Sequence, residues 1–266
     1  MEPTFSEFSY GYAITEELSS GRLGPLTGAP IFPSLHSEGQ SGGGYDVHIP
    51  VEGMPLFLQF KLSRYLQRSN ALEWDLFGGP YYRMYLRPSR YSNQHALLLD
   101  LAMSNDVYYV APKFHTVEEL NHAYISRNVY DNSILINPIT IGQLPDDDLH
   151  YIVFSATNQG FHFFSEQPRK LEGFHSGWDF TEYELTKIRQ RKIKIDAYLF
   201  EFIAGEIMGI LDRRAMKTER LKLLQIDRKK KGETLQEKAQ FTSYLTRVFF
   251  DAELFIVSER NDIPYV

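Results

Sequence analysis

Two polar residues interrupt an apolar, strand-like run and limit how this part of the chain can fold. The run covers residues 56–62 and contains Gln59 and Lys61. Because side chains alternate between the two faces of a strand, Gln59 and Lys61 share one face and Phe60 points to the other. A lysine in a buried strand is costly unless it has a partner or a task. The run therefore predicts a buried strand that carries a polar site on one face.

A hard divalent cation would give these residues a task. Asp46 follows a glycine-rich approach at the head of the preceding strand-like segment. The Asp46 carboxylate, the Gln59 amide oxygen and the backbone carbonyl of Phe60 would supply oxygen ligands for Mg²⁺ or Mn²⁺. Lys61 would then hold a metal-bound water or a phosphate oxygen. A structural interpretation stands beside this one, in which Asp46 is a turn residue, Gln59 pairs with a neighbouring strand and Lys61 extends along the surface.

Asp46 followed by Gln59-Phe60-Lys61 resembles the catalytic core of the PD-(D/E)xK nuclease superfamily, which has the restriction-endonuclease-like fold. The resemblance covers roughly residues 8–165 and implies a central mixed sheet flanked by helices. It also implies that Asp46, Gln59 and Lys61 are catalytic, together with an acid on the first helix, Glu17 or Glu16. Two departures from the family pattern are Tyr45, where many members have Pro, and Gln59, which removes one negative charge from the metal site.

The resemblance implies a metal-dependent nuclease, expected to be a DNA endonuclease more than an RNA-directed nuclease. By analogy it extends to restriction, repair or anti-phage defence. Hydrolysis would use Mg²⁺ or Mn²⁺. The glutamine at position 59 keeps an alternative open, in which the core is a degenerate scaffold that binds a protein partner through its C-terminal helices.

Strand-like and helix-like segments interleave up to about residue 165, which is typical of an α/β layer architecture. The helices are expected over residues 7–19, 93–103 and 117–128, the last capped by Thr116. The strands are expected over 45–51, 55–62, 81–86, 107–112, 134–141, 150–155 and 161–165. The first two strands are expected to form a hairpin that turns at Glu52-Gly53.

The character of the chain changes after Trp178. Residues 181–226 and 234–259 have apolar residues at helical spacing and predict two long helices. We therefore expect a nuclease-like domain over residues 1–175 and a helical module over 176–266, through which the protein forms a homo-oligomer or docks a partner. Basic residues of this module are candidates for nucleic-acid binding, although a solvated helix surface explains them equally well: Arg189, Arg191, Lys192, Lys194, Lys229 and Lys230.

Other polar and aromatic residues carry weaker indications. Gln94 and His95 open a helix that would run near the site, but a position on the helix surface is the favoured interpretation. His36 and Glu38 flank the glycine loop and are candidates for lining the cleft. Tyrosines at 81–82 and 108–109 can stack nucleobases, yet aromatic strands usually serve the core.

Composition excludes several classes of protein. The chain has 266 residues and no cysteine, so it has no disulfide, thiolate metal site or thiol nucleophile. No apolar run reaches the length of a membrane span, and the N-terminal residues lack the pattern of a secretory signal. A cytoplasmic protein that does not enter the membrane is therefore expected. The net charge of −6 does not by itself suggest a nucleic-acid partner.

Overall fold

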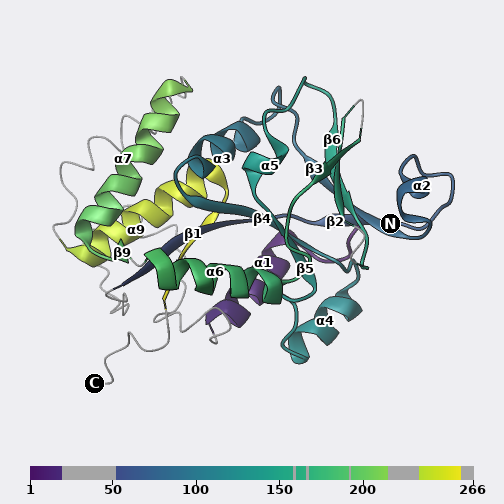
Figure 1. Ribbon diagram of the computed structural model, residues 1–266, viewed down its shortest axis with the longest axis horizontal. Coiled ribbons are helices and arrows are strands. Elements are labelled where there is room, and N and C mark those ends of the chain that lie inside the picture. Colours follow the sequence, from purple (N-terminus) through teal and green to yellow (C-terminus); the bar gives the residue numbers. More distant parts are fainter. Residues whose placement is uncertain (20–51, 158–159, 166–167, 192, 215–233, 259–266) are drawn as a thin grey trace.

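The protein is a mixed α/β structure in which helices surround two five-stranded sheets. The computed structural model (Figure 1) describes residues 1–19, 52–157, 160–165, 168–191, 193–214 and 234–258. Strands and helices alternate through most of this length, as the sequence predicts. The two sheets differ in their strand directions and in how helices cover them.

The central sheet is mixed. Its strand order is β10 (Glu253–Val257), β1 (Glu52–Phe60), β4 (Asp106–Pro112) and β5 (Ser133–Ile136), and the two-residue strand β9 (Ile193–Lys194) also pairs with β1. β1 and β4 are parallel, with Gln59 opposite Tyr109, whereas β10, β9 and β5 are antiparallel to their neighbours. Parallel neighbours need coverage on both faces, and both faces of this sheet are covered by helices.

One face of the central sheet packs against α3 (Gln94–Ala102), α5 (Pro138–Ile141), α7 (Ala197–Arg213) and α9 (Leu235–Leu245). Phe57 and Tyr109 belong to this core, which also contains apolar side chains of α3 and α7. The other face packs against α1 (Glu7–Ser19), α4 (Val117–Ile125) and α6 (Gly177–Arg191), and it contributes Leu56 and Leu58. Alternate residues of β1 therefore serve two separate cores.

The second sheet is entirely antiparallel and lies beside the central sheet (Figure 1). Its order is β2 (Ser63–Leu66), β3 (Tyr81–Leu86), β6 (His150–Phe154), β7 (Phe161–Phe164) and β8 (Arg169–Leu171), and the short helix α2 (Trp74–Phe77) packs on its outer face. The aromatic strand predicted over residues 81–86 belongs to this sheet. Tyr81 and Tyr82 are buried, as the favoured interpretation of this strand predicted.

The C-terminal part differs most from the prediction. Two long helices were expected over residues 181–226 and 234–259, but the first is divided into α6, β9 and α7, and the second ends in a different structure. After α9 the chain forms the π-helix η1 (Thr246–Phe250) and then β10, which pairs with β1 over five residues from Glu253 to Val257. Residues on both sides of the expected boundary at 175 thus share one sheet and one core.

The predicted hairpin turn at Glu52-Gly53 is also wrong. Both residues lie in β1 and pair with Lys194 and Ile193 of β9. Gly53 does not form a turn, but it allows β10 to approach β1 closely. A Cβ atom at this position would lie 2.5 Å from the carbonyl oxygen of Val257. The strand expected over residues 45–51 lies outside the described residues.

Other boundaries agree closely with the sequence. α1 has the predicted limits, and α4 begins after the predicted cap Thr116, whose hydroxyl accepts a hydrogen bond from the Glu119 backbone N–H at 3.2 Å. The strand expected over 134–141 is shorter, because Asn137 and Pro138 begin α5. Asn137 caps that helix and proline fits its first turn, which explains the change of structure.

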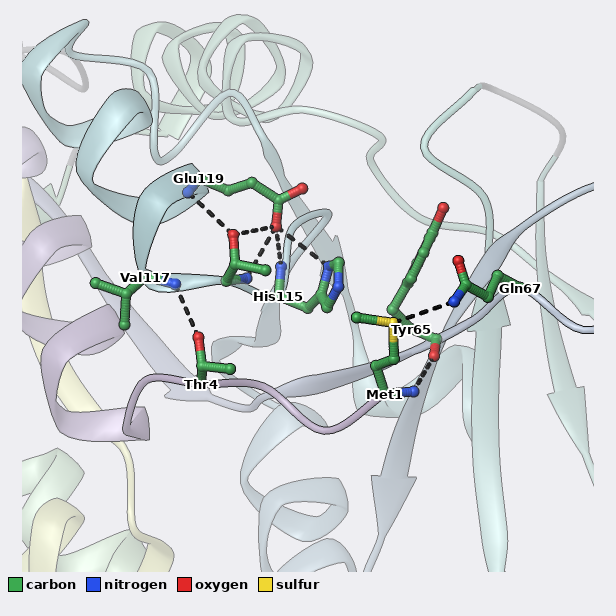
Figure 2. Close-up of polar contacts among 8 residues, drawn as sticks. Met1, Thr4, Tyr65, Gln67, His115, Val117 and Glu119 are labelled. Carbon is green, nitrogen blue, oxygen red and sulfur yellow. Dashed lines mark hydrogen bonds and ion pairs between the residues drawn. The ribbon is translucent and has the colours of Figure 1, made fainter.

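The first six residues run between β2 and α4 and lead directly into α1 (Figure 2). The Tyr65 backbone N–H donates to the carbonyl of Met1 at 3.0 Å, and the Thr4 N–H donates to the carbonyl of His115 at 2.9 Å. The Val117 N–H donates to the Thr4 hydroxyl at 2.9 Å. These contacts anchor the chain immediately before Glu7, the first residue of α1.

Candidate functional site

Lys61 is a buried cation at the carboxyl end of β1. Its backbone N–H donates to the carbonyl of Val110 at 2.9 Å, so it continues the parallel pairing with β4 one residue beyond the strand. Its side chain is 7 % exposed. Burial lowers the pKa of Lys61 below its usual range, and the nearby carboxylates of Glu7 and Asp251 oppose that shift. The Lys61 ammonium is therefore shielded from water and acted on by two carboxylates, instead of extending into solvent.

Gln94, the first residue of α3, joins Lys61 to the C-terminal part of the chain. The Lys61 ammonium donates to Gln94 Oε1 at 3.0 Å, and Gln94 Nε2 donates to Asp251 Oδ2 at 2.9 Å. The sequence favoured a surface position for Gln94, but its side chain is buried. The reason is that the start of α3 packs against both the end of β1 and the loop after η1.

Glu7 brings a second carboxylate to Lys61 from the first turn of α1. Burial raises the pKa of Glu7 above its usual range, and the Lys61 ammonium partly opposes that shift. Arg87, which follows β3, is exposed and also acts electrostatically on both residues. Five elements or their ends therefore converge here: α1, β1, β3, α3 and the loop after η1.

Gln59 lies in β1 opposite Tyr109, two residues before Lys61. Its side chain is completely buried, and among the described residues neither its amide nitrogen nor its amide oxygen has a hydrogen-bond partner. Phe60 points to the opposite face, where its ring meets Tyr10 edge-on at 6.0 Å. The predicted alternation along this strand is confirmed, and it leaves the Gln59 amide on the same face as Lys61.

Glu17 and Glu16 lie at the other end of α1 from Glu7. Ten residues of helix separate Glu17 from Glu7 by about 15 Å along the axis. Both Glu17 oxygens accept backbone N–H groups, from Val129 at 2.8 Å and from Tyr130 at 2.9 Å, and Glu16 pairs with Arg127. The helix acid expected from the resemblance is therefore not brought to Lys61, and Glu17 instead holds the turn before β5.

Several predicted residues cannot be placed relative to Lys61. Asp46, His36, Glu38, Lys192, Lys229 and Lys230 lie outside the described residues. Of the remaining basic candidates, Arg189 and Arg191 lie in the last turn of α6, and Lys194 lies in β9, paired with Asp196 at 3.2 Å. This basic group is on α6 and β9, on elements that do not contribute to the Lys61 site.

His95 was expected on the surface and is instead a buried structural residue. One of its ring nitrogens lies 2.8 Å from the Tyr109 hydroxyl, and the other lies 2.7 Å from the carbonyl of Gly142. Burial lowers the pKa of His95, in agreement with a neutral ring in the core. The tyrosines at 108 and 109 are buried too, as favoured from the sequence.

The sequence did not predict Glu7 or Asp251 as neighbours of Lys61, and it placed Gln94 near the site only as the less favoured interpretation. A signal existed for Glu7, because it is an acid in the first turn of a correctly predicted helix. No signal existed for Asp251, which is distant in sequence and fell inside a segment predicted to be helical. Its place beside the site depends on the strand β10 that follows it.

The residues present partly suit a divalent cation. The orphaned Gln59 amide oxygen and the Glu7 carboxylate are oxygen donors, the type that Mg²⁺ and Mn²⁺ prefer. Within the described part of the chain, however, no three His, Cys, Asp or Glu side chains are grouped so that they could hold a metal ion. Asp46, which the sequence predicts as a further ligand, lies outside the described residues.

Comparisons with known proteins do not assign the chain to a family. No family model, no curated protein and no solved structure matches the chain. Among the helices described, none combines the length and apolar character needed to cross a membrane.

Proposed function

We propose that the protein is a metal-dependent phosphodiesterase that hydrolyses nucleic acid, with DNA as a more suitable substrate than RNA. One observation supports the proposal above the others. A buried ammonium, that of Lys61, stands at the carboxyl end of a strand, where the Glu7 and Asp251 carboxylates act on it electrostatically, and it lies on the same face as the unsatisfied amide of Gln59. The resemblance to the PD-(D/E)xK nucleases predicts such a lysine and such an amide at these two positions.

In this proposal each residue has a defined role. Asp46, Gln59 and Phe60 would hold Mg²⁺ or Mn²⁺ through their oxygen atoms, and Glu7 would take the place of Glu17 as the helix acid. A metal held there would supply a water of lowered pKa and would stabilise charge on the scissile phosphate. Lys61 stabilises the negative charge that develops on the phosphate, and its burial strengthens that interaction because water screens it less.

The test compares two lysines that are both shielded from water but lie in different parts of the fold. Lys61→Met removes the proposed charge, and Lys113→Met removes another part-buried lysine whose ammonium donates to the carbonyl of His175 at 2.6 Å. Burial lowers the pKa of both lysines. We expect Lys61→Met to lose roughly 100-fold or more of the cleavage rate on plasmid DNA with Mg²⁺ or Mn²⁺, and Lys113→Met to retain it. Equal cleavage by both variants would remove Lys61 from the mechanism.

A second candidate function is a nuclease-like scaffold that binds a protein partner or a second copy of the chain. Two observations favour it. Gln59 is completely buried, as a purely structural residue would be, and α7 exposes two aromatic side chains one turn apart, Tyr198 at 74 % and Phe202 at 58 %. The wild-type protein decides between the candidates in the same assay, because a scaffold cleaves neither DNA nor RNA with either metal ion.

A further inference from the structure

A chain of two hydrogen bonds links Asp251 to Lys61 through the side-chain amide of Gln94. The Lys61 ammonium donates to Gln94 Oε1 at 3.0 Å, and Gln94 Nε2 donates to Asp251 Oδ2 at 2.9 Å. These three residues come from the end of β1, the start of α3 and the loop after η1. They are far apart in sequence, so only the folded chain brings them together.

The two neighbours of Gln94 admit a single orientation of its amide. An ammonium can only donate hydrogen bonds and an ionised carboxylate can only accept them. With the amide reversed, its NH₂ group would face the Lys61 ammonium and its oxygen would face the Asp251 carboxylate. Both contacts would then be repulsive in a site where Gln94 and Lys61 are almost completely buried. Asp251 and Lys61 therefore select the same orientation from opposite sides.

We propose that Asp251 is a positioning residue for Lys61. Asp251 holds the Gln94 amide so that the amide oxygen faces the Lys61 ammonium, and this hydrogen bond fixes the direction of the ammonium. The orientation itself follows from the hydrogen-bond chemistry of the three side chains. Its effect on catalysis rests on the proposed function. Among the described residues, the other charged groups that act on Lys61 are Glu7 of α1 and Arg87 after β3, and no hydrogen bond through Gln94 joins either of them to it.

The backbone at Asp251 places this carboxylate firmly. Asp251 ends η1 in the left-handed region, at φ 52°, and its N–H donates to the carbonyl of Arg247 at 3.1 Å. The residues on either side, Phe250 and Ala252, are buried in the core. Aspartate and asparagine tolerate the left-handed region better than most residues. A variant with asparagine therefore changes the hydrogen-bond chemistry without adding backbone strain.

The test uses Asp251→Asn, Gln94→Glu and the double variant. In Asp251→Asn the new amide can both donate and accept, so position 251 no longer selects the orientation of Gln94, and Lys61 alone has to hold it against a weaker, uncharged neighbour. Gln94→Glu alone places two carboxylates side by side. In the double variant, a glutamate at position 94 accepts from Lys61 on one side and from the asparagine NH₂ group on the other, which restores the chain of hydrogen bonds. Rescue by the second substitution is the specific expectation.

Stability gives a measurement that does not depend on activity. Each single variant should lower the midpoint of thermal unfolding by roughly 2–4 °C, and the double variant should return close to the wild-type value. The control is Asp148→Asn, which removes an exposed aspartate of the loop before β6. It should leave the midpoint unchanged. Losses that add in the double variant, or a midpoint unchanged in Asp251→Asn, would overturn the inference.

Kinetics test the catalytic consequence separately. Asp251→Asn should lower kcat by roughly tenfold, the loss expected when a hydrogen bond to a charged group is weakened, with KM nearly unchanged. The double variant should recover most of kcat. If the unfolding pattern appears but the wild-type protein cleaves no nucleic acid, the orientation of Gln94 is supported and the proposed function fails. If cleavage is present and kcat does not follow the rescue, Asp251 does not position Lys61 for catalysis.

Discussion

Removing β10 should unfold the protein, although this strand lies far beyond the expected boundary at residue 175. β10 pairs with β1 over five residues, from Met54 opposite Val257 to Leu58 opposite Glu253. A chain that ends at Asp251 loses this pairing and leaves β1 with a long unpaired edge. It also removes the buried side chains of Phe255 and Val257 from the core between β1 and α1.

The expected loss is large compared with the stability of a domain. Burial of a Phe or Val side chain contributes about 1.5–3 kcal/mol, so the two side chains contribute about 3–6 kcal/mol. Loss of the strand pairing adds on the order of 1 kcal/mol for each hydrogen bond. A typical domain is stable by about 5–15 kcal/mol. The deletion therefore removes most of the stability, and truncation near residue 175 removes still more, because α6, α7 and α9 are lost as well.

The assay is urea unfolding followed by near-ultraviolet circular dichroism, which reports fixed aromatic packing. The chain ending at Asp251 should show no cooperative transition, and a matched chain ending at Ser258, which keeps β10, should unfold as the full-length protein does. A cooperative transition at the full-length midpoint in the shorter chain would refute the claim that β10 completes the core. It would instead restore a separable N-terminal domain.

Two further predictions concern α6. Burial, reinforced by the Asp106 carboxylate, raises the pKa of Glu184 to about 7, while the Lys187 ammonium opposes the shift. The folded protein therefore holds a proton that the unfolded chain releases near pH 4.5. As a result, the free energy of unfolding falls as pH rises from about 4.5 to 7. Glu184→Gln should flatten this slope and make the protein more stable at pH 8 by roughly 1–3 kcal/mol in urea unfolding, and an unchanged slope would contradict it. Gly177→Ala should cost about 1–3 kcal/mol of unfolding free energy, because a Cβ atom there would lie 2.0 Å from the Tyr130 ring; unaltered stability would show that the ring can move aside.

Local chemistry made several elements predictable. Thr116 and Glu119 are a capping box, which determines where α4 begins whatever the rest of the chain does. The run 56–62 alternates between two faces, and the structure places Phe60 on one face and Lys61 on the other as expected. In each case the deciding interactions lie within a few residues of sequence.

The errors arise where distant residues decide. Glu52-Gly53 has the composition of a turn, but β9 pairs with it and extends the strand. Residues 253–257 have an apolar spacing that continues the preceding helix, but the free edge of β1 offers backbone hydrogen bonds that draw them into a strand. Intrinsic preferences are weak compared with such pairing, so tertiary context overrides them.

The sequence by itself determined that a lysine would stand on one face of a largely apolar strand, with Gln59 beside it and Phe60 opposed. Alternation of side chains along a strand is a property of the backbone, so it can be predicted without knowing which strands lie beside it. Only the tertiary structure decided which groups surround that lysine, and these are Glu7, Gln94 and Asp251 rather than Glu17. The choice depends on which ends of α1, α3 and η1 pack together, and that packing is set by contacts between residues far apart in the chain.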